Sequence, residues 1–499
     1  MDALVTNTLL VTMDPDVSGA TGALGIDGEI TYVGPASEVD AAAADRIVDG
    51  GGCLTLPGLV NAHVHGRQTI LRGAAQDVPE IEWMTRALGP IADHATAADG
   101  VVGARLTAIE ALASGTTTLG EYATNVSELV ASVYRPHGLR VVATETISEV
   151  TADRSDRDPD EPYPLDDAAG TAALDRAESL FERFADDPLV EPAYGPQALD
   201  MVSLDRLETI TDRAREADRT VHVHVAQGDR ERRQIAARYG DGATTVGILE
   251  REGLLGDHLL AAHLHGATPT ERDQLADAGV RMVGCPSSIT AIDGVVPPVV
   301  EYRDAGGVVG LGTDQAPGPG GHDALREART TAMVTKAAHA DPTALDAAGA
   351  LQLATVGGAR ALGIADRVGT LTPGKRADVV CCDLTRPSIA PCVREPFHTA
   401  IPNLVYGGGD VVQDVFVDGV QVVSAGGIVG VDVDAVVTEA AERARRIFDD
   451  AAADWRAADS ALVDAASISR WIVSCVVTDS SPAASAASTA SRAPSTNGE

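Results

Sequence analysis

The sequence predicts a (β/α)8 barrel joined to a small β-sandwich domain that both chain ends build together. Three observations support this fold class. The chain has 499 residues, of which 44% are hydrophobic, enough for one large barrel with additions or for two to three domains. Short apolar runs alternate with longer Ala- and Arg-rich stretches through the middle of the chain, as in parallel βα units. Strand-rich segments precede and follow this middle part.

The strand-rich chain ends are expected to form the small domain. Residues 1–55 contain short β-rich runs with a hairpin-type turn at Asp27-Gly28. Residues 369–430 contain similar runs with a turn at Asp418-Gly419. A single domain built from both segments explains why they flank the rest of the chain.

The barrel is expected over residues 56–368. Its eight predicted strands are residues 56–65, 116–123, 140–147, 189–197, 220–227, 258–265, 280–286 and 308–314. In this fold the functional site lies at the C-terminal ends of the strands. Five polar residues fall at those ends: His63, His65, His224, His263 and Asp314.

Three further segments complete the organisation. The acidic stretch 151–167 is expected to be a solvated loop or insertion after the third strand. Residues 431–465 are expected to form a C-terminal helix. Residues 466–499 are rich in Ser and Ala, which is typical of low-complexity, disordered segments.

The net charge of −35 restricts the possible partners and the environment. Lys336 and Lys375 are the only lysines, and no basic patch is visible, so nucleic acid is not an expected partner. The acidic residues are spread along the chain. Such a surface suits either a cationic partner or high salt, where self-repulsion is screened. We favour the second interpretation, a halophilic protein.

Cysteine usage and hydropathy indicate a cytoplasmic protein. The six cysteines form no C-x-x-C pair, which argues against a structural zinc ribbon, and they suit a reducing compartment. The N-terminus has no basic region of the kind that begins a signal peptide, and no apolar run is long enough to span a bilayer. We therefore expect no membrane partner.

The stretch LPGLVNAHVHG, residues 56–66, organises the predicted site. Its two histidines, His63 and His65, are two positions apart on a strand and therefore project from the same face. Two neutral imidazoles on one rigid wall form half of a site for a divalent metal. The alternative is a pair of histidines that simply pack at a strand end.

Nine short patches, in order, resemble the amidohydrolase superfamily. They are PGLVNAHVH, LRGAAQDVPEIEWM, EALASGTTT, HVHVAQ, AAHLHGAT, CPSSI, GLGTD, ATVGGARALG and GTLTPGKRADVV. The similar branch contains aminohydrolases and chlorohydrolases: adenosylhomocysteine/methylthioadenosine deaminases, guanine deaminases and triazine hydrolases. The resemblance covers roughly residues 1–430.

The resemblance implies a ligand set for one divalent metal: His63, His65, His224 and Asp314. Zn²⁺ is the expected ion, with Fe²⁺ or another divalent ion as the alternative. Asp314 would also accept the proton of the attacking water, and His263 would stabilise the oxyanion of a tetrahedral adduct. His222, His265 and His322 are ambiguous. Relatives also suggest a homo-oligomer.

Two positions depart from the family pattern. The acid expected three residues after His224 is Gln227, which cannot titrate and can only orient a substrate by hydrogen bonds. Gln197 stands where many relatives carry a histidine. Asp229 and Glu231 are nearby acids but out of register. Trp83 matches a family segment that covers the substrate, where its ring could stack on a flat heterocycle.

The predicted function is metal-dependent hydrolysis of a carbon–nitrogen bond other than a peptide bond, most simply deamination of an aromatic heterocycle. Gln227, Trp83 and Gln197 would contact this small-molecule substrate. One alternative is a triazine-type hydrolase that releases halide or alkylamine, or a hydrolase of cyclic amides. The other is a metal-containing binding protein that lost turnover because Gln227 replaces the usual acid.

Overall fold

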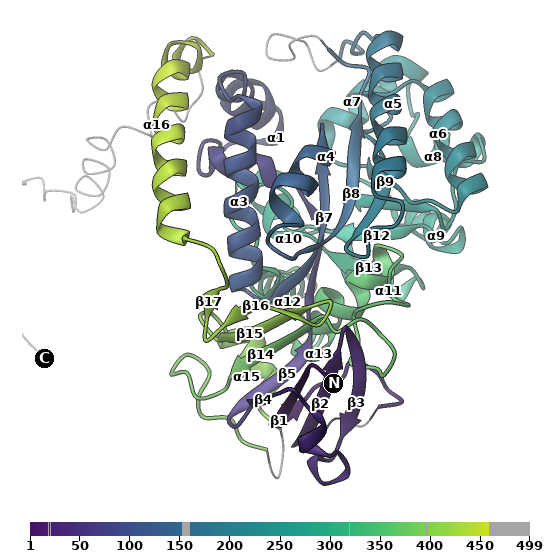
Figure 1. Ribbon diagram of the computed structural model, residues 1–499. Coiled ribbons are helices and arrows are strands. Elements are labelled where there is room, and N and C mark those ends of the chain that lie inside the picture. Colours follow the sequence, from purple (N-terminus) through teal and green to yellow (C-terminus); the bar gives the residue numbers. More distant parts are fainter. Residues whose placement is uncertain (18, 20, 152–159, 319, 395–397, 459–499) are drawn as a thin grey trace, which may run out of the picture.

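The computed structural model describes residues 1–458 except 18, 20, 152–159, 319 and 395–397 (Figure 1). Eight parallel strands form one sheet in the order β13-β12-β11-β10-β9-β8-β7-β6. Their bounds are β6 Leu59–Val64, β7 Thr116–Ala123, β8 Arg140–Ile147, β9 Val190–Pro196, β10 Val221–Val225, β11 Leu259–His263, β12 Arg281–Gly284 and β13 Val308–Leu311. Each lies within one of the eight predicted ranges.

The two outer strands of this sheet meet and close the barrel just beyond their ends. Val64 forms a parallel bridge with Asp314. The Asp314 N–H donates to the His63 carbonyl at 3.0 Å, and the His65 N–H donates to the Asp314 carbonyl at 3.0 Å. The predicted barrel is therefore confirmed, and its closure brings three predicted site residues together.

Most of the helices surround the barrel on its outer side (Figure 1). The helix bounds are α1 Glu80–Glu82, α2 Gly89–Ala92, α3 Ala97–Ala113, α4 Val126–Leu129, α5 Asp167–Arg183, α6 Leu204–Ala217, α7 Asp229–Tyr239, α8 Thr245–Arg251, α9 Pro269–Asp277, α10 Pro286–Ile292, α11 Val299–Asp304, α12 Ala324–His339, α13 Ala347–Gln352, α14 Gly358–Ala361, α15 Ala400–Gly407 and α16 Val433–Ala457. Several begin with a capping side chain; Thr96 and Asp99, for example, form a capping box at α3.

Both chain ends contribute to a second, mixed sheet at one end of the barrel (Figure 1). Its order is β17-β16-β15-β14-β5-β1-β2-β3, and β4 pairs with β1. The bounds are β1 Ala3–Leu10, β2 Thr21–Asp27, β3 Glu29–Gly34, β4 Arg46–Asp49, β5 Cys53–Pro57, β14 Val379–Asp383, β15 Val412–Val417, β16 Val420–Ser424 and β17 Gly427–Ile428. Its core joins both chain ends, with Leu24 and Ile26 against Val379 and Phe416.

The structure corrects two details of this small domain. Leu56 and Pro57, which we assigned to the barrel, pair with Val380 and Val379 in the small sheet. An apolar run that passes from one sheet into the next offers no composition change to mark the crossing. The domain is also one continuous sheet, and the N–H of Ile30 in β3 donates to the Lys375 carbonyl just before β14, so the sheet curls back on itself.

A buried ion pair links the small sheet to the barrel. Arg140, at the start of β8, donates to both carboxylate oxygens of Asp378 at 2.9 Å and to Asp418 at 3.2 Å. Only 3% of the Arg140 side chain is exposed. Its bidentate geometry compensates for the desolvation of the charges.

The C-terminal helix α16 packs on α3 (Figure 1). Its apolar residues Ala440, Ile447 and Ala451 contact a cluster that includes Ile91 and Val102. Arg443 and Arg446 of α16 both reach Asp99 of α3. Residues 459–465 of the predicted helix and the predicted disordered tail, 466–499, lie outside the described residues.

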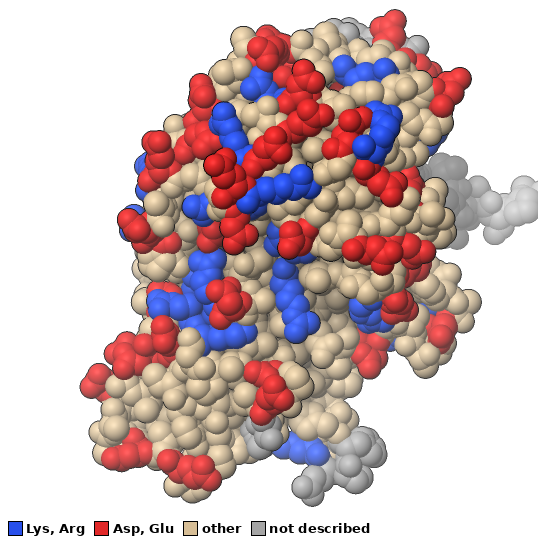
Figure 2. Space-filling view, turned by 90° about the vertical axis from the view of Figure 1, so that its right-hand side faces the viewer, with Lys and Arg blue, Asp and Glu red and all other residues tan. Residues whose placement is uncertain are grey.

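Acidic side chains are spread over the face drawn in Figure 2, both on the barrel and on the small sheet, with arginines among them. None of the helices in the described part of the chain has the length and apolar character needed to cross a membrane.

Candidate active site

Two of the predicted metal ligands are oriented by backbone carbonyls. His65 Nδ1 lies 2.9 Å from the Tyr122 carbonyl, and His224 Nδ1 lies 2.7 Å from the Gln197 carbonyl. A carbonyl can only accept, so each Nδ1 must carry the proton. Each Nε2 therefore presents a lone pair to the inside of the barrel mouth, as a metal ligand requires.

His63 is oriented by a buried side chain. Its Nδ1 lies 2.9 Å from His222 Nε2, and His222 Nδ1 lies 3.3 Å from Thr144 Oγ1. When His63 donates to His222, which in turn donates to Thr144, His63 Nε2 is left with a lone pair. That Nε2 is buried and has no hydrogen-bond partner in the described part of the chain.

Asp314 completes this set. Ser288 donates to its Oδ2 at 2.5 Å. Its Oδ1 lies 3.4 Å from His65 Nε2 and 3.7 Å from His63 Nε2, longer than a good hydrogen bond. Two ligands that bind one zinc ion at about 2.0–2.2 Å in tetrahedral geometry are themselves about 3.3–3.6 Å apart. These side chains therefore fit a shared divalent ion.

The ligand atoms form two overlapping groups, and within each group all atoms lie within 4.8 Å of one another. The groups are His63, His65 and His224, and His63, His263 and Asp314. The geometry thus brings together all five predicted metal and catalytic residues. His263 lies at the end of β11, and its Nδ1 is buried without a hydrogen-bond partner among the described residues. It can turn a donor toward a reacting group.

Burial keeps His65, His224 and His263 neutral. It lowers the pKa of His65 to about 4, assisted by the neighbouring His63, and the pKa of His263 to about 3. Burial also holds the pKa of His224 well below its ordinary value. Neutral imidazoles at pH 7 are ready to bind a metal because no proton has to leave.

The backbone is strained at three of the strand ends that carry the site. His263 has φ 82°, Asp314 has φ 61°, and Ala226, beside Gln227, has φ 49°. Residues with a Cβ rarely adopt these left-handed conformations, which are found preferentially at functional sites. Here they turn the side chains that follow β10, β11 and β13 into the barrel mouth.

The predicted substrate contacts lie in different settings. The side-chain Nε2 of Gln227 is buried and has no partner among the described residues, so it is available to a ligand. Gln197 uses its carbonyl to orient His224. Trp83 lies in an apolar cluster with Ala75, Val78 and Ala87. The roles of all three toward a substrate stay predictions.

The two acids near Gln227 point elsewhere. Glu231 is buried and accepts from the Gln227 N–H at 2.7 Å and from the Ala226 N–H at 3.2 Å. Asp229 is exposed and pairs with Arg232. Neither carboxylate is free to serve a substrate.

The three ambiguous histidines also have distinct positions. His222 orients His63, as described above. His322 lies between two threonines, with Nε2 2.8 Å from Thr69 Oγ1 and Nδ1 3.0 Å from Thr313 Oγ1, and so supports the segment that carries Asp314. His265 Nε2 lies 3.6 Å from Asp293 Oδ2.

Sequence reasoning missed several supporting groups. The carbonyls of Tyr122 and Gln197 have no residue signature, because any residue carries a carbonyl. Ser288 and Thr144 orient Asp314 and His222. Ser288 lies within CPSSI, one of the patches that carried the family resemblance, and that position was the signal that could have identified it.

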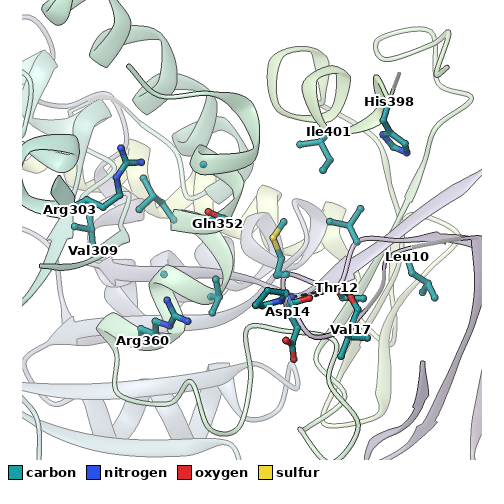
Figure 3. A pocket seen from close by; sticks show the side chains of 18 of the residues that line it. Leu10, Thr12, Asp14, Val17, Arg303, Val309, Gln352, Arg360, His398 and Ile401 are labelled. Carbon is teal, nitrogen blue, oxygen red and sulfur yellow. Dashed lines mark hydrogen bonds between the residues drawn. The ribbon is translucent and has the colours of Figure 1, made fainter. Parts of the chain in front are cut away.

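A separate cavity of about 1200 Å³ opens at the opposite end of the barrel (Figure 3). It is lined by Gly307 and Val308 at the start of β13, by Thr12 and Asp14, and by Arg360. Figure 3 shows Arg303 and Arg360 on one side and Leu10, Thr12 and Val17 on the other. The predicted site residues do not line this cavity.

Comparison with known proteins agrees with the geometry. The Amidohydrolase family model matches residues 54–422. A 5-methylthioadenosine/S-adenosylhomocysteine deaminase of Syntrophobacter fumaroxidans is 34% identical over 411 residues, 81% of this chain and 89% of that protein.

Solved structures share the architecture. An adenosine deaminase from Xanthomonas campestris, solved with bound zinc, superposes with a TM-score of 0.80 at 31% identity, covering 89% of this chain and 98% of that one. An atrazine chlorohydrolase from Arthrobacter aurescens, solved with zinc, gives a TM-score of 0.78 at 24% identity, covering 89% and 100%. The second likeness shows the fold alone. The match to the family model includes the whole barrel and, of the small sheet, β14, β15, nearly all of β5 and part of β16. On this basis the chain belongs to the amidohydrolase family.

Proposed function

We propose that this protein is a zinc-dependent deaminase that hydrolyses the ring amino group of an adenine-type nucleoside or a related heterocycle. The observation that carries this proposal is the convergence of three oriented histidines, His63, His65 and His224, with Asp314. Similarity to a methylthioadenosine/adenosylhomocysteine deaminase and to an adenosine deaminase supports the substrate class. A bound divalent ion would supply a Lewis acid that makes water nucleophilic near neutral pH.

The protein's own residues divide the remaining work. His63, His65, His224 and Asp314 would hold the ion. Asp314 would take a proton from the attacking water and later pass it to the departing amino group. His263, with an unpartnered ring nitrogen, would stabilise the oxygen that develops negative charge.

Gln227 and Trp83 would position the heterocycle. The unpartnered Nε2 of Gln227 offers a donor to ring atoms. The indole of Trp83, whose N–H has no partner among the described residues, offers a ring face and a donor. Gln197 would act mainly through the carbonyl that orients His224.

A substrate panel on zinc-loaded protein in molar salt tests this proposal. Adenosine, 5′-deoxyadenosine, methylthioadenosine, adenosylhomocysteine and guanine are assayed for ammonia release, with zinc content measured in parallel. We expect one zinc per chain and turnover of at least one adenine nucleoside. The variant His224→Gln should lose both zinc and activity. Failure to bind zinc, or no ammonia from any compound, would contradict the proposal.

One observation favours a second candidate. Gln227 cannot deliver a proton, and a halide leaving group needs less proton delivery than an amine. Chlorinated triazines with chloride detection therefore belong in the same panel, and chloride release without ammonia would identify a triazine-type hydrolase. Zinc binding without any turnover would favour the binding-protein interpretation.

The setting of the enzyme is part of the proposal. A cytoplasmic location is supported by Cys53, Cys285, Cys381, Cys382 and Cys392, all of which are free thiols. The resemblance supports a homo-oligomer, and the net charge of −35 supports a high-salt environment.

A further inference from the structure

Three ionisable side chains from three different segments meet beside Gln227. A Cβ atom built on Gly228, the next residue, would lie 3.2 Å from Asp293 Oδ1, 3.2 Å from Glu80 Oε2 and 3.3 Å from His265 Nε2. The φ of Gly228 is +132°, which side-chain-bearing residues rarely adopt. Glycine therefore lets this cluster approach the backbone at the end of β10.

Of the two carboxyl groups in this cluster, that of Asp293 makes fewer interactions than that of Glu80. Asp293 caps the C-terminal end of α10, the helix that follows β12, and its side chain is 12% exposed. Its Oδ2 lies 3.6 Å from His265 Nε2, too long for a hydrogen bond. Glu80, in contrast, accepts from Arg230 Nε at 3.2 Å and from its backbone N–H at 3.2 Å.

The surroundings of Asp293 favour its protonated form. Burial, then the neighbouring carboxylates of Glu80 and Asp314, raise the pKa of Asp293 to about 7, and Arg230 only partly offsets them. The Arg230 guanidinium forms ion pairs with both Asp200 and Glu80. Burial lowers the pKa of His265 to about 4, so its ring is neutral at pH 7.

We propose that Asp293 is the proton donor of this active site and replaces the acid that position 227 lacks. The inference rests on the proposed deaminase function. In the family pattern the acid follows the strand-5 metal ligand by three residues. Here that residue is Gln227, and the Asp293 carboxyl lies against the very next residue, Gly228. The acid thus comes from the C-terminal end of α10 instead of the end of β10.

The proton balance of the reaction is complete with two carboxyl groups. As the water oxygen bonds to the ring carbon, one water proton moves to Asp314, and the Asp293 carboxyl gives its proton to the ring nitrogen. The proton on Asp314 then moves to the amino group, the carbon–nitrogen bond breaks, and ammonia leaves. The remaining hydroxyl proton returns to the Asp293 carboxylate as the ring carbonyl forms.

Gln227 has a defined role in this scheme. Its amide cannot titrate, but its buried Nε2 has no partner in the described chain and can hydrogen-bond the heterocycle beside the nitrogen that receives the proton. Gln227 would therefore position the ring, and Asp293 would protonate it. A carboxylate at both positions would place two negative charges together and raise the pKa of at least one of them.

The test compares Asp293→Asn with wild type on the best substrate of the panel. We expect kcat to fall by about 10²-fold or more, the range for loss of a placed acid. The acid must be protonated, so wild-type kcat/KM should decline as pH rises through about 7, and D293N should lack this alkaline limb. Zinc content should be unchanged. When Gln227→Glu is added to D293N, the kcat of the double variant should be at least tenfold higher than that of D293N.

Asp229→Asn is the matched control, because Asp229 directly follows Gly228 in the sequence but is exposed and paired with Arg232. It should leave kcat and the pH profile unchanged. A second readout needs no turnover: ¹³C-carboxyl NMR of the zinc-loaded wild type should show one aspartate that titrates near pH 7 and is missing in D293N.

The outcomes separate the two proposals. An active wild type with an unchanged D293N, or with no aspartate titrating between pH 6 and 8, would overturn the assignment of Asp293 and leave the deaminase proposal standing. A wild type that releases no ammonia from any compound would refute the deaminase proposal itself.

Discussion

His222 should control zinc affinity although it does not face the ion site. Its Nε2 lies 2.9 Å from His63 Nδ1, where it can accept the His63 proton, and both side chains are fully buried. Replacement by phenylalanine removes the acceptor and leaves the His63 N–H unpartnered. His63 can then place its proton on Nε2, the atom that must remain free for the metal.

The size of the effect follows from this geometry. An unpartnered buried donor costs about 1–3 kcal/mol. Loss of a hydrogen-bond partner behind a metal-binding histidine typically weakens the metal site by about 10–100-fold, or about 1.4–2.7 kcal/mol. The two ranges agree, so we expect His222→Phe to raise the zinc Kd by at least tenfold.

Competition with a chelator of known affinity measures the zinc Kd directly, without any substrate. His222→Gln, which can keep an acceptor near His63, should lose less affinity than His222→Phe. His258→Gln is the control, since His258 lies just before β11 at the other end of the barrel. Equal zinc affinity in wild type and His222→Phe would refute the idea that this hydrogen bond orients His63.

Three further outcomes concern stability. The Tm should rise between 0.1 and 1 M salt, because the Debye length falls from about 10 Å to about 3 Å and screens the net charge of −35; a flat Tm would contradict the halophilic interpretation. Asp99→Asn should destabilise the protein by about 2 kcal/mol in urea unfolding at pH 7. Burial opposes ionisation of Asp99, but hydrogen bonds from Thr96, Arg443 and Arg446 lower its pKa to about 2. Its contribution is therefore full above about pH 4 and lost toward pH 2, so the two proteins should converge there. Arg140→Met should destabilise by about 3–5 kcal/mol, since it strands the buried carboxylate of Asp378; a loss below 1 kcal/mol would show that this link is dispensable.

The barrel was predictable because its signal is local and repeated. Parallel strands covered by helices on their outer faces are short, continuous apolar runs, and eight such runs occur in the chain. The carboxyl ends of parallel strands all lie at the same end of the barrel. Residues at those ends are therefore expected to meet there, and they are His63, His65, His224, His263 and Asp314. The fold brings these residues together even though more than 250 positions separate His63 from Asp314.

The parts that escaped prediction depend on contacts between distant segments. A carbonyl such as that of Tyr122 becomes a histidine acceptor only through the register of neighbouring strands. Asp293 has no sequence context that marks it as an acid of the site, because its surroundings come from α1, α7 and the loop after β11. The crossing from the small sheet into the barrel was equally hidden, since Leu56 and Pro57 continue the same apolar run.

Gln227 taken alone would suggest a protein that has lost turnover, but the energetics of the site argue otherwise. His63 Nε2, His263 Nδ1 and Gln227 Nε2 are buried without partners in the described structure. Each such atom costs about 1–3 kcal/mol when left unsatisfied, and the left-handed backbone at His263 and Asp314 adds strain. Apolar side chains at these positions would avoid this cost. An ion for the histidines and a polar heterocycle for Gln227 would supply hydrogen-bond and ligand partners to these atoms. A working site with its acid moved to Asp293 accounts for the unsatisfied groups and for the glutamine together.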